Sequence, residues 1–172
     1  MKLRNVVTGT LGVLAIQSAL GQVPVGPTGI AWTATESFEA LSSSSEYLHF
    51  GGFGGTATFQ RYGGGWMRAT SSAYSGSQGM FLDQTDLTIG FASPKRTFGG
   101  YFLSVDSATT GMYVSFYRGS RLVGVTVLTS LSTSRWSWRG WDLTALGGFD
   151  RVRIVGNGGF AGMINVDALR VR

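Results

Sequence analysis

The chain has 172 residues, 43% of them hydrophobic and 13% charged, with a formal net charge of +5, 27 glycines and no cysteine. The lack of cysteine excludes a disulfide scaffold, and the 13% aromatic content argues against a disordered chain, because aromatic side chains supply the burial that disordered segments lack. One domain of this length buries a substantial core, and low charge with abundant Gly, Ser and Thr favours many short strands joined by tight turns.

The first 21 residues have the pattern of an export signal. Lys2 and Arg4 form a charged head, residues 6–16 form an apolar segment, and residues 19–21 place small side chains at the cleavage positions. The apolar segment is too short to span a bilayer comfortably, although an uncleaved anchor is the alternative. We predict a secreted protein, periplasmic or extracellular, that is not inserted in a membrane after cleavage. Its predicted organisation is a signal peptide over 1–21, an extended lead-in over 22–35 and a β-sandwich domain over 36–172.

The positive charge is spread along the chain. Without the signal segment, 12 of the 14 basic residues remain against 9 acidic residues. Most lie opposite apolar residues on strand-like runs, as at Arg118, Arg121, Arg151 and Arg153. Nucleic-acid binding requires basic residues clustered with exposed aromatics, so we predict no nucleic-acid partner and interpret these arginines as solvated outer faces of strands.

Strand-like runs separated by turn residues continue from residue 37 onward. We predict strands over 37–41, 57–62, 66–70, 79–83, 87–92, 97–105, 111–118, 122–129 and 136–141, and a terminal pair within 149–172. The glycines at 63–65 and the turn at 117–121 each predict a hairpin. About ten strands at this turn spacing predict an all-β fold, an antiparallel β-sandwich.

The last strand-like run changes face part of the way along. Ile164 and Val166 share one parity, whereas Leu169 and Val171 share the other. Because side chains alternate strictly along a strand, this change predicts a bulge or bend near Asp167. We place most of the core at Phe102, Tyr113, Phe116, Val123, Val125, Val152, Ile154, Ile164 and Val166.

Catalytic motifs are scarce. Residues 156–161 match a dinucleotide-binding glycine pattern, but a strand-like run follows where a helix is required, so we interpret them as a hairpin loop. The chain has a single histidine, His49, and Ser77 lacks the spacing of a nucleophile elbow. No pair of carboxylates is recognisable as a glycosidase site. We predict that the protein is not an enzyme.

Aromatic residues are the best candidates for ligand contact, because their rings can stack on sugars. Trp136 and Trp138 share one parity, which is typical of the buried face of a strand. Trp141 is out of phase with them and is the freer candidate. The predicted ligand-binding residues are Trp66, Arg68, Tyr74, Arg139 and Trp141, with the two arginines donating hydrogen bonds to hydroxyl groups. The alternative is that all five tryptophans are packed.

Several motifs together resemble a known group of domains. They are FE-x-L at 38–41, SGSQGM at 75–80, F-x-x-P at 91–94, FGGYFLSV at 98–105, a V-x-F-Y-x-G-x-x-x-V hairpin at 114–123 and a closing INVDALRV. In this order they resemble secreted bacterial jelly-roll domains of the galactose-binding-like type, and especially uncharacterised domains of PEP-CTERM-type exported proteins. The likeness spans roughly residues 36–172. The sorting tail of that second group is absent, so membrane sorting by that route is not implied.

The resemblance implies a jelly-roll topology and a structural calcium ion. Carried over by position, Glu39 and Asp167 would be the ligands, with Glu36 as the alternate. The alternative is that Asp167 only accepts backbone N–H groups at its bend. We therefore predict a non-catalytic extracellular binding or surface-matrix module for a glycan or cell-surface component. The alternative function is a structural or adhesive cell-envelope protein without a small-molecule ligand.

Overall fold

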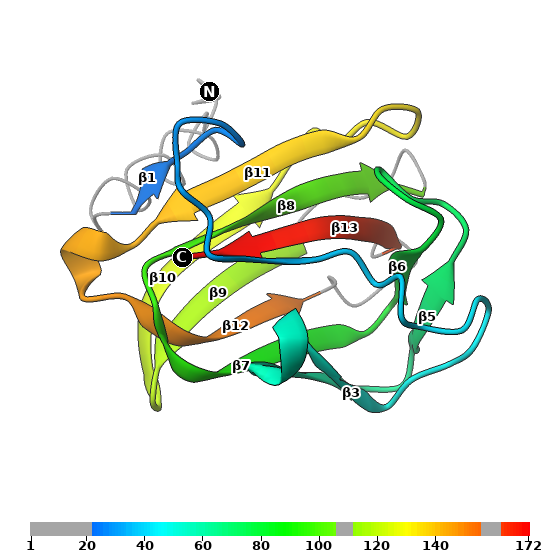
Figure 1. Ribbon diagram of the computed structural model, residues 1–172, viewed down its shortest axis with the longest axis horizontal. Coiled ribbons are helices and arrows are strands. Elements are labelled where there is room, and N and C mark those ends of the chain that lie inside the picture. Colours follow the sequence, from blue (N-terminus) through cyan, green and yellow to red (C-terminus); the bar gives the residue numbers. More distant parts are fainter. Residues whose placement is uncertain (1–21, 106–111, 156–162) are drawn as a thin grey trace, which may run out of the picture.

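The computed structural model describes residues 22–105, 112–155 and 163–172 (Figure 1). Its regular structure there is strand, apart from two single 3₁₀ turns at Phe53–Gly55 and Thr144–Leu146. Over these ranges no helix is long and apolar enough to cross a membrane. The predicted signal peptide and the glycine pattern at 156–161 lie outside the described residues.

Two antiparallel sheets face each other (Figure 1). The seven-stranded sheet has the order β1-β11-β8-β13-β6-β5, with β2 also paired to β13. Its strands are β1 (Val23–Pro24), β2 (Ala34–Glu36), β5 (Trp66–Thr70), β6 (Gly79–Asp83), β8 (Thr97–Ser104), β11 (Ser137–Asp142) and β13 (Ile164–Val171). The six-stranded sheet has the order β10-β9-β12-β7-β4-β3. Its strands are β3 (His49–Gly52), β4 (Ala57–Tyr62), β7 (Asp86–Lys95), β9 (Met112–Arg118), β10 (Arg121–Leu128) and β12 (Phe149–Val155).

The predicted fold class, an antiparallel β-sandwich of jelly-roll type, is confirmed, although the described residues form 13 strands and not about ten. The chain repeatedly crosses between sheets. Consequently β4 and β5 do not form the predicted hairpin, and neither do β12 and β13, whereas β9 and β10 do. Alternation in a sequence marks a strand but not its partner, and a glycine turn can connect two layers as well as two neighbours.

The expected strand at 37–41 is not formed. Phe38 has a φ of 61°, outside the extended region, and its side chain is completely buried. Its N–H donates to a carboxylate oxygen of Glu36 at 2.8 Å. The segment is therefore a turn that directs an aromatic ring into the core, since a β conformation requires negative φ.

The core lies between the sheets and is rich in phenylalanine. Seven of the nine predicted core residues are buried. The prediction was wrong for Tyr113, which is 41% exposed, and for Val125, which is half-buried. Strict alternation along β9 points Phe116 inward, so Tyr113 must lie on the opposite face. A register shift between Leu122 and Gly124 allows Val123 to be buried while Val125 faces outward.

The predicted face change in the last strand is confirmed. The pairing of β13 with β8 shifts register between Asp167 and Arg170, and Ala168 has a φ of 46°. The bulge keeps the apolar residues on both sides of it in the core. It also places Asp167 opposite Tyr101, on the outer face of the seven-stranded sheet.

Candidate functional site

A hollow of about 650 Å³ lies on the outer face of the six-stranded sheet. We call it the groove. It is lined by Thr58, Gln60 and Tyr62 of β4, Thr88 and Gly90 of β7, Tyr117 of β9, and Arg151 and Arg153 of β12. The residues that alternate with them, such as Phe59, Ile89 and Val152, are completely buried. The strand period thus gives one face to the core and leaves the other for polar and tyrosine side chains.

Strand pairing aligns the outward residues in three rows that run across the strands. The rows are Tyr62, Asp86, Val155 and Tyr113; then Gln60, Thr88, Arg153 and Ser115; then Thr58, Gly90, Arg151 and Tyr117. Neighbouring strands lie about 4.8 Å apart, so the four lining strands span about 14 Å. At Gly90 an added Cβ would meet no atom within 4 Å, so the space above this residue is open.

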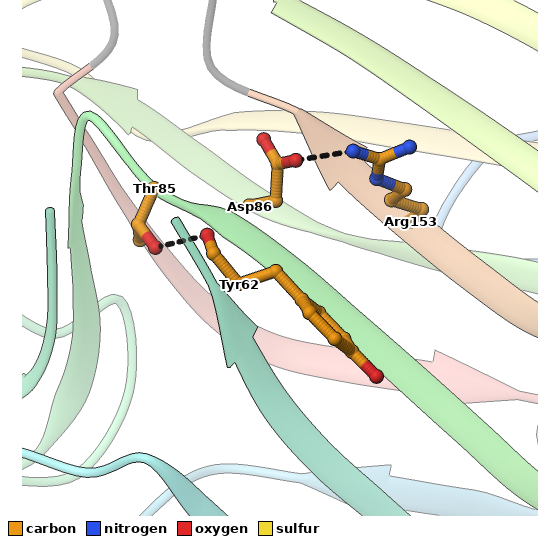
Figure 2. Close-up of polar contacts among 4 residues, drawn as sticks. All are labelled: Tyr62, Thr85, Asp86 and Arg153. Atoms are coloured by element: carbon orange, nitrogen blue, oxygen red, sulfur yellow. Dashed lines mark hydrogen bonds and ion pairs between the residues drawn. The ribbon is translucent and has the colours of Figure 1, made fainter. Parts of the chain in front are cut away.

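One end of the groove carries an ion pair. A guanidinium nitrogen of Arg153 donates to a carboxylate oxygen of Asp86 at the start of β7 (Figure 2). The pKa of Arg153 is raised, and this hydrogen bond makes the largest contribution to the rise. Nearby, the hydroxyl of Thr85 donates to the backbone carbonyl of Tyr62 at 2.9 Å, which holds the end of β4 against the turn before β7 (Figure 2).

Arg151 occupies the other side of the groove. Its guanidinium carbon lies 4.7 Å from the centre of the Tyr117 ring, and one of its nitrogens donates to the carbonyl of Gly119 at 3.0 Å. None of the eight lining residues is an acid. The arrangement therefore offers two cationic donors, neutral hydrogen-bonding groups and tyrosine rings.

The tryptophans of β11 have the reverse of their predicted placement. Trp141 is only 5% exposed, and its ring contacts Phe98, Phe102 and Phe116 in the core, so it offers no open face. Trp138 lies on the outer face, where its indole N–H donates to the carbonyl of Val25 at 2.8 Å. Parity correctly separates Trp138 from Trp141 but does not say which of the two faces inward.

The other predicted ligand-binding residues lie apart from the groove. Trp66 is 47% exposed on β5, and the guanidinium of Arg68 lies 5.9 Å from its ring centre. Tyr74 is 43% exposed, and its ring stacks on Tyr101 with centroids 3.4 Å apart. Arg139 donates to two backbone carbonyls, and burial lowers its pKa. The structure brings Trp66 and Arg68 together but not all five residues, and their role in binding stays a prediction.

The groove itself was missed from the sequence. Its residues had a visible signal, since polar or small side chains alternate with apolar ones at 58–60, at 88–90 and at 151–153. These segments are far apart in the chain, and only the pairing of β4, β7 and β12 makes them neighbours. Period-2 alternation identifies a solvent face, but not which solvent faces adjoin.

The two carboxylates predicted to bind calcium hold the segment 74–78. Asp167 is completely buried, and its oxygens accept the N–H groups of Tyr74, Ser75 and Ala168 at 2.6–2.9 Å. Burial raises the pKa of Asp167, while these hydrogen bonds oppose the rise. The exposed Glu39 accepts hydrogen bonds from the N–H and hydroxyl of Ser77 and from the N–H of Gln78. The bond from the Ser77 hydroxyl contributes most to the lowered pKa of Glu39.

This donor set does not fit a calcium ion, because calcium takes oxygen ligands and here N–H donors approach both carboxylates. The alternate residue, Glu36, likewise accepts the N–H groups of Phe38 and Phe53. No group of three or more His, Cys, Asp or Glu side chains suited to a metal occurs among the described residues. The bond from the Ala168 N–H is the kind that the alternative expects at the bend, whereas the bonds from Tyr74 and Ser75 come from a distant loop.

Melting curves test the calcium site that the sequence led us to expect at Glu39 and Asp167. An ion bound only by the folded chain must raise the melting temperature as its concentration increases. A chelator should then lower the melting temperature, and Asp167→Asn should remove the difference. Identical curves in calcium and in chelator would leave both carboxylates as acceptors of N–H groups alone.

No protein-family model and no curated protein matches the chain, but solved structures share its fold. A cleaved adhesin domain of Lys-gingipain has a TM-score of 0.56 at 16% identity, over 80% of this chain and 98% of that one. A second such domain, from Porphyromonas gingivalis, has a TM-score of 0.53 at 13% identity, over 83% and 99%. The CBM22-1–GH10 modules of a Clostridium thermocellum endo-1,4-β-D-xylanase, complexed with xylohexaose, have a TM-score of 0.51 at 8% identity, over 82% of this chain and 28% of that one. At these identities the likeness shows the fold alone, an antiparallel β-sandwich.

Proposed function

We propose that the protein is a non-catalytic module that binds a glycan in the groove of the six-stranded sheet. The observation that carries this proposal is the groove itself, an open hollow of about 650 Å³ lined by hydrogen-bonding side chains and tyrosines. Sugars present hydroxyl groups and apolar ring faces together. Gln60, Thr88 and the two arginines can bond hydroxyls, while Tyr62 and Tyr117 can contact ring faces.

The shape and chemistry of the groove favour binding of a chain over catalysis. It crosses four strands, so it suits an oligosaccharide segment and not only a single sugar. Glycoside hydrolysis requires two facing carboxyl groups, and no lining residue carries one. Among the solved structures with this fold, the xylanase modules hold xylohexaose and the Lys-gingipain domains are named adhesins, which supports binding or adhesion at the level of the fold. Action outside the cell follows from the export pattern in residues 1–21.

Filling the groove should abolish glycan binding without unfolding the protein. Gly90→Leu places a side chain in open space on an extended strand, so we expect affinity for a retained glycan to fall about tenfold or more. Glycine weakens a strand interior, so the melting temperature should stay the same or rise. A glycan array followed by titration calorimetry measures binding, and circular dichroism measures melting.

Gly64→Leu is the matched control, because Gly64 also borders open space but lies in the turn after β4, outside the groove. It should bind like the parent chain. Unchanged affinity in Gly90→Leu would place the glycan elsewhere. If the array retains no glycan at all, the adhesive alternative becomes the better reading, with the exposed Trp66 and its neighbour Arg68 as the first surface to test.

A further inference from the structure

We propose that the groove selects an anionic polysaccharide, one whose sugars carry carboxylate or sulfate groups, over a neutral chain of the same backbone. This inference rests on the proposed glycan-binding function and specifies its ligand. It is carried by Arg151 and Arg153, which are two residues apart on β12 and both line the groove. Positions i and i+2 of a strand are about 7 Å apart on one face, so both guanidinium groups can face a single bound chain.

Arg151 is the main anion anchor. The described residues place no carboxylate in an ion pair with it; the bond to Gly119 uses one of its five N–H donors. Its contact with Tyr117 orients the planar guanidinium beside an aromatic ring. A guanidinium held in this way can donate two parallel hydrogen bonds to one carboxylate or sulfate while the sugar ring packs on tyrosine.

Arg153 contributes less, because Asp86 already opposes its charge. Asp86 stands at the end of the groove and is not among the lining residues. Arg151 and Arg153 are the two charged residues among the eight that line the groove, so the lining itself is positively charged. The rest of the chain adds to the attraction, since without residues 1–21 it carries 12 basic against 9 acidic residues, a net of +3, and long-range fields of one sign concentrate ligands of the other.

Two matched glycan pairs test this selection on the full chain. Polygalacturonate is compared with its methyl ester, and dextran sulfate with dextran, so that each pair differs in charge on a common backbone. We expect the anionic member of at least one pair to bind about tenfold more tightly, and expect this advantage to shrink when ionic strength rises from about 0.05 M to about 0.5 M.

Two variants with opposite expected effects on anionic binding test whether the selection for anionic chains arises in the groove. Arg151→Gln should remove most of the anionic advantage, whereas Asp86→Asn should increase anionic affinity about two- to fivefold, because it frees Arg153. Arg135→Gln makes the same charge change at an exposed arginine outside the groove and should behave like the parent.

The outcomes separate this inference from the function on which it rests. Equal binding within both pairs would overturn anion selection but leave glycan binding intact. If Arg135→Gln reduced the preference for anionic polysaccharides as much as Arg151→Gln does, the assignment of this preference to the groove would be overturned. If the protein binds none of the four polysaccharides and also no glycan on a neutral array, both the proposed function and the inference are removed.

Discussion

Replacing Trp141 with alanine is expected to lower the free energy of unfolding by about 3–5 kcal/mol. The ring is 5% exposed and meets Phe98 and Phe116 at centroid distances of 6.3 and 5.6 Å. Removing it leaves a cavity between the two sheets that the surrounding rings can fill only in part. Because domains are stable by about 5–15 kcal/mol, this single change is a large fraction of the total. Urea denaturation measures the loss.

Trp66→Ala provides the comparison within the same residue type. Its ring is 47% exposed and contacts the guanidinium of Arg68, so truncation should cost no more than about 1 kcal/mol. Below its melting temperature, Trp141→Ala should keep the parent's glycan affinity, since the ring does not reach the groove. Loss of affinity with unchanged stability would instead mean that Trp141 is an open binding platform.

Asp167→Ala is the second large effect, expected to cost about 2–4 kcal/mol. The substitution removes the acceptor of three backbone N–H groups, two of them in the loop over β13. Hydrogen exchange should show the loss locally, with faster exchange at Tyr74 and Ser75 than in the core strands. Glu39→Ala, which removes an exposed acceptor of the same loop, should cost less.

The pH dependence of stability gives Asp167 a second readout. Burial raises its pKa above the ordinary value of 3.8, so the folded chain holds this proton more tightly than the unfolded chain does. Its contribution to stability is therefore greatest below pH 3.8 and is lost as pH rises through the raised pKa. Glu39, with its lowered pKa, acts in the opposite sense and loses its contribution as pH falls. Asp167→Asn should remove the loss of stability with rising pH that Asp167 causes and leave the contribution of Glu39 in place. An unchanged pH profile of stability would show that Asp167 does not titrate in this way.

Several features of the fold could be predicted from the sequence because they depend on neighbours in the chain. Most strand positions follow from local alternation, and the bulge in β13 follows from the parity change between Val166 and Leu169. Local alternation did not predict backbone conformations that depend on contacts outside the segment. Phe38 leaves the extended region because the core accepts its ring and Glu36 accepts its N–H.

By itself, the sequence determined that this is an all-β chain and divided each strand into two faces. Which face is buried was decided by the tertiary structure, because Trp138 and Trp141 are equally apolar and only the position of β11 over the core distinguishes them. The groove likewise exists only through pairing. Thr58, Gly90 and Arg151 come from three distant segments, and the register of β4, β7 and β12 places them in one row. Alternation is a property of one strand, whereas a binding surface is a property of several, and the contacts between strands are set by the packing of the whole core.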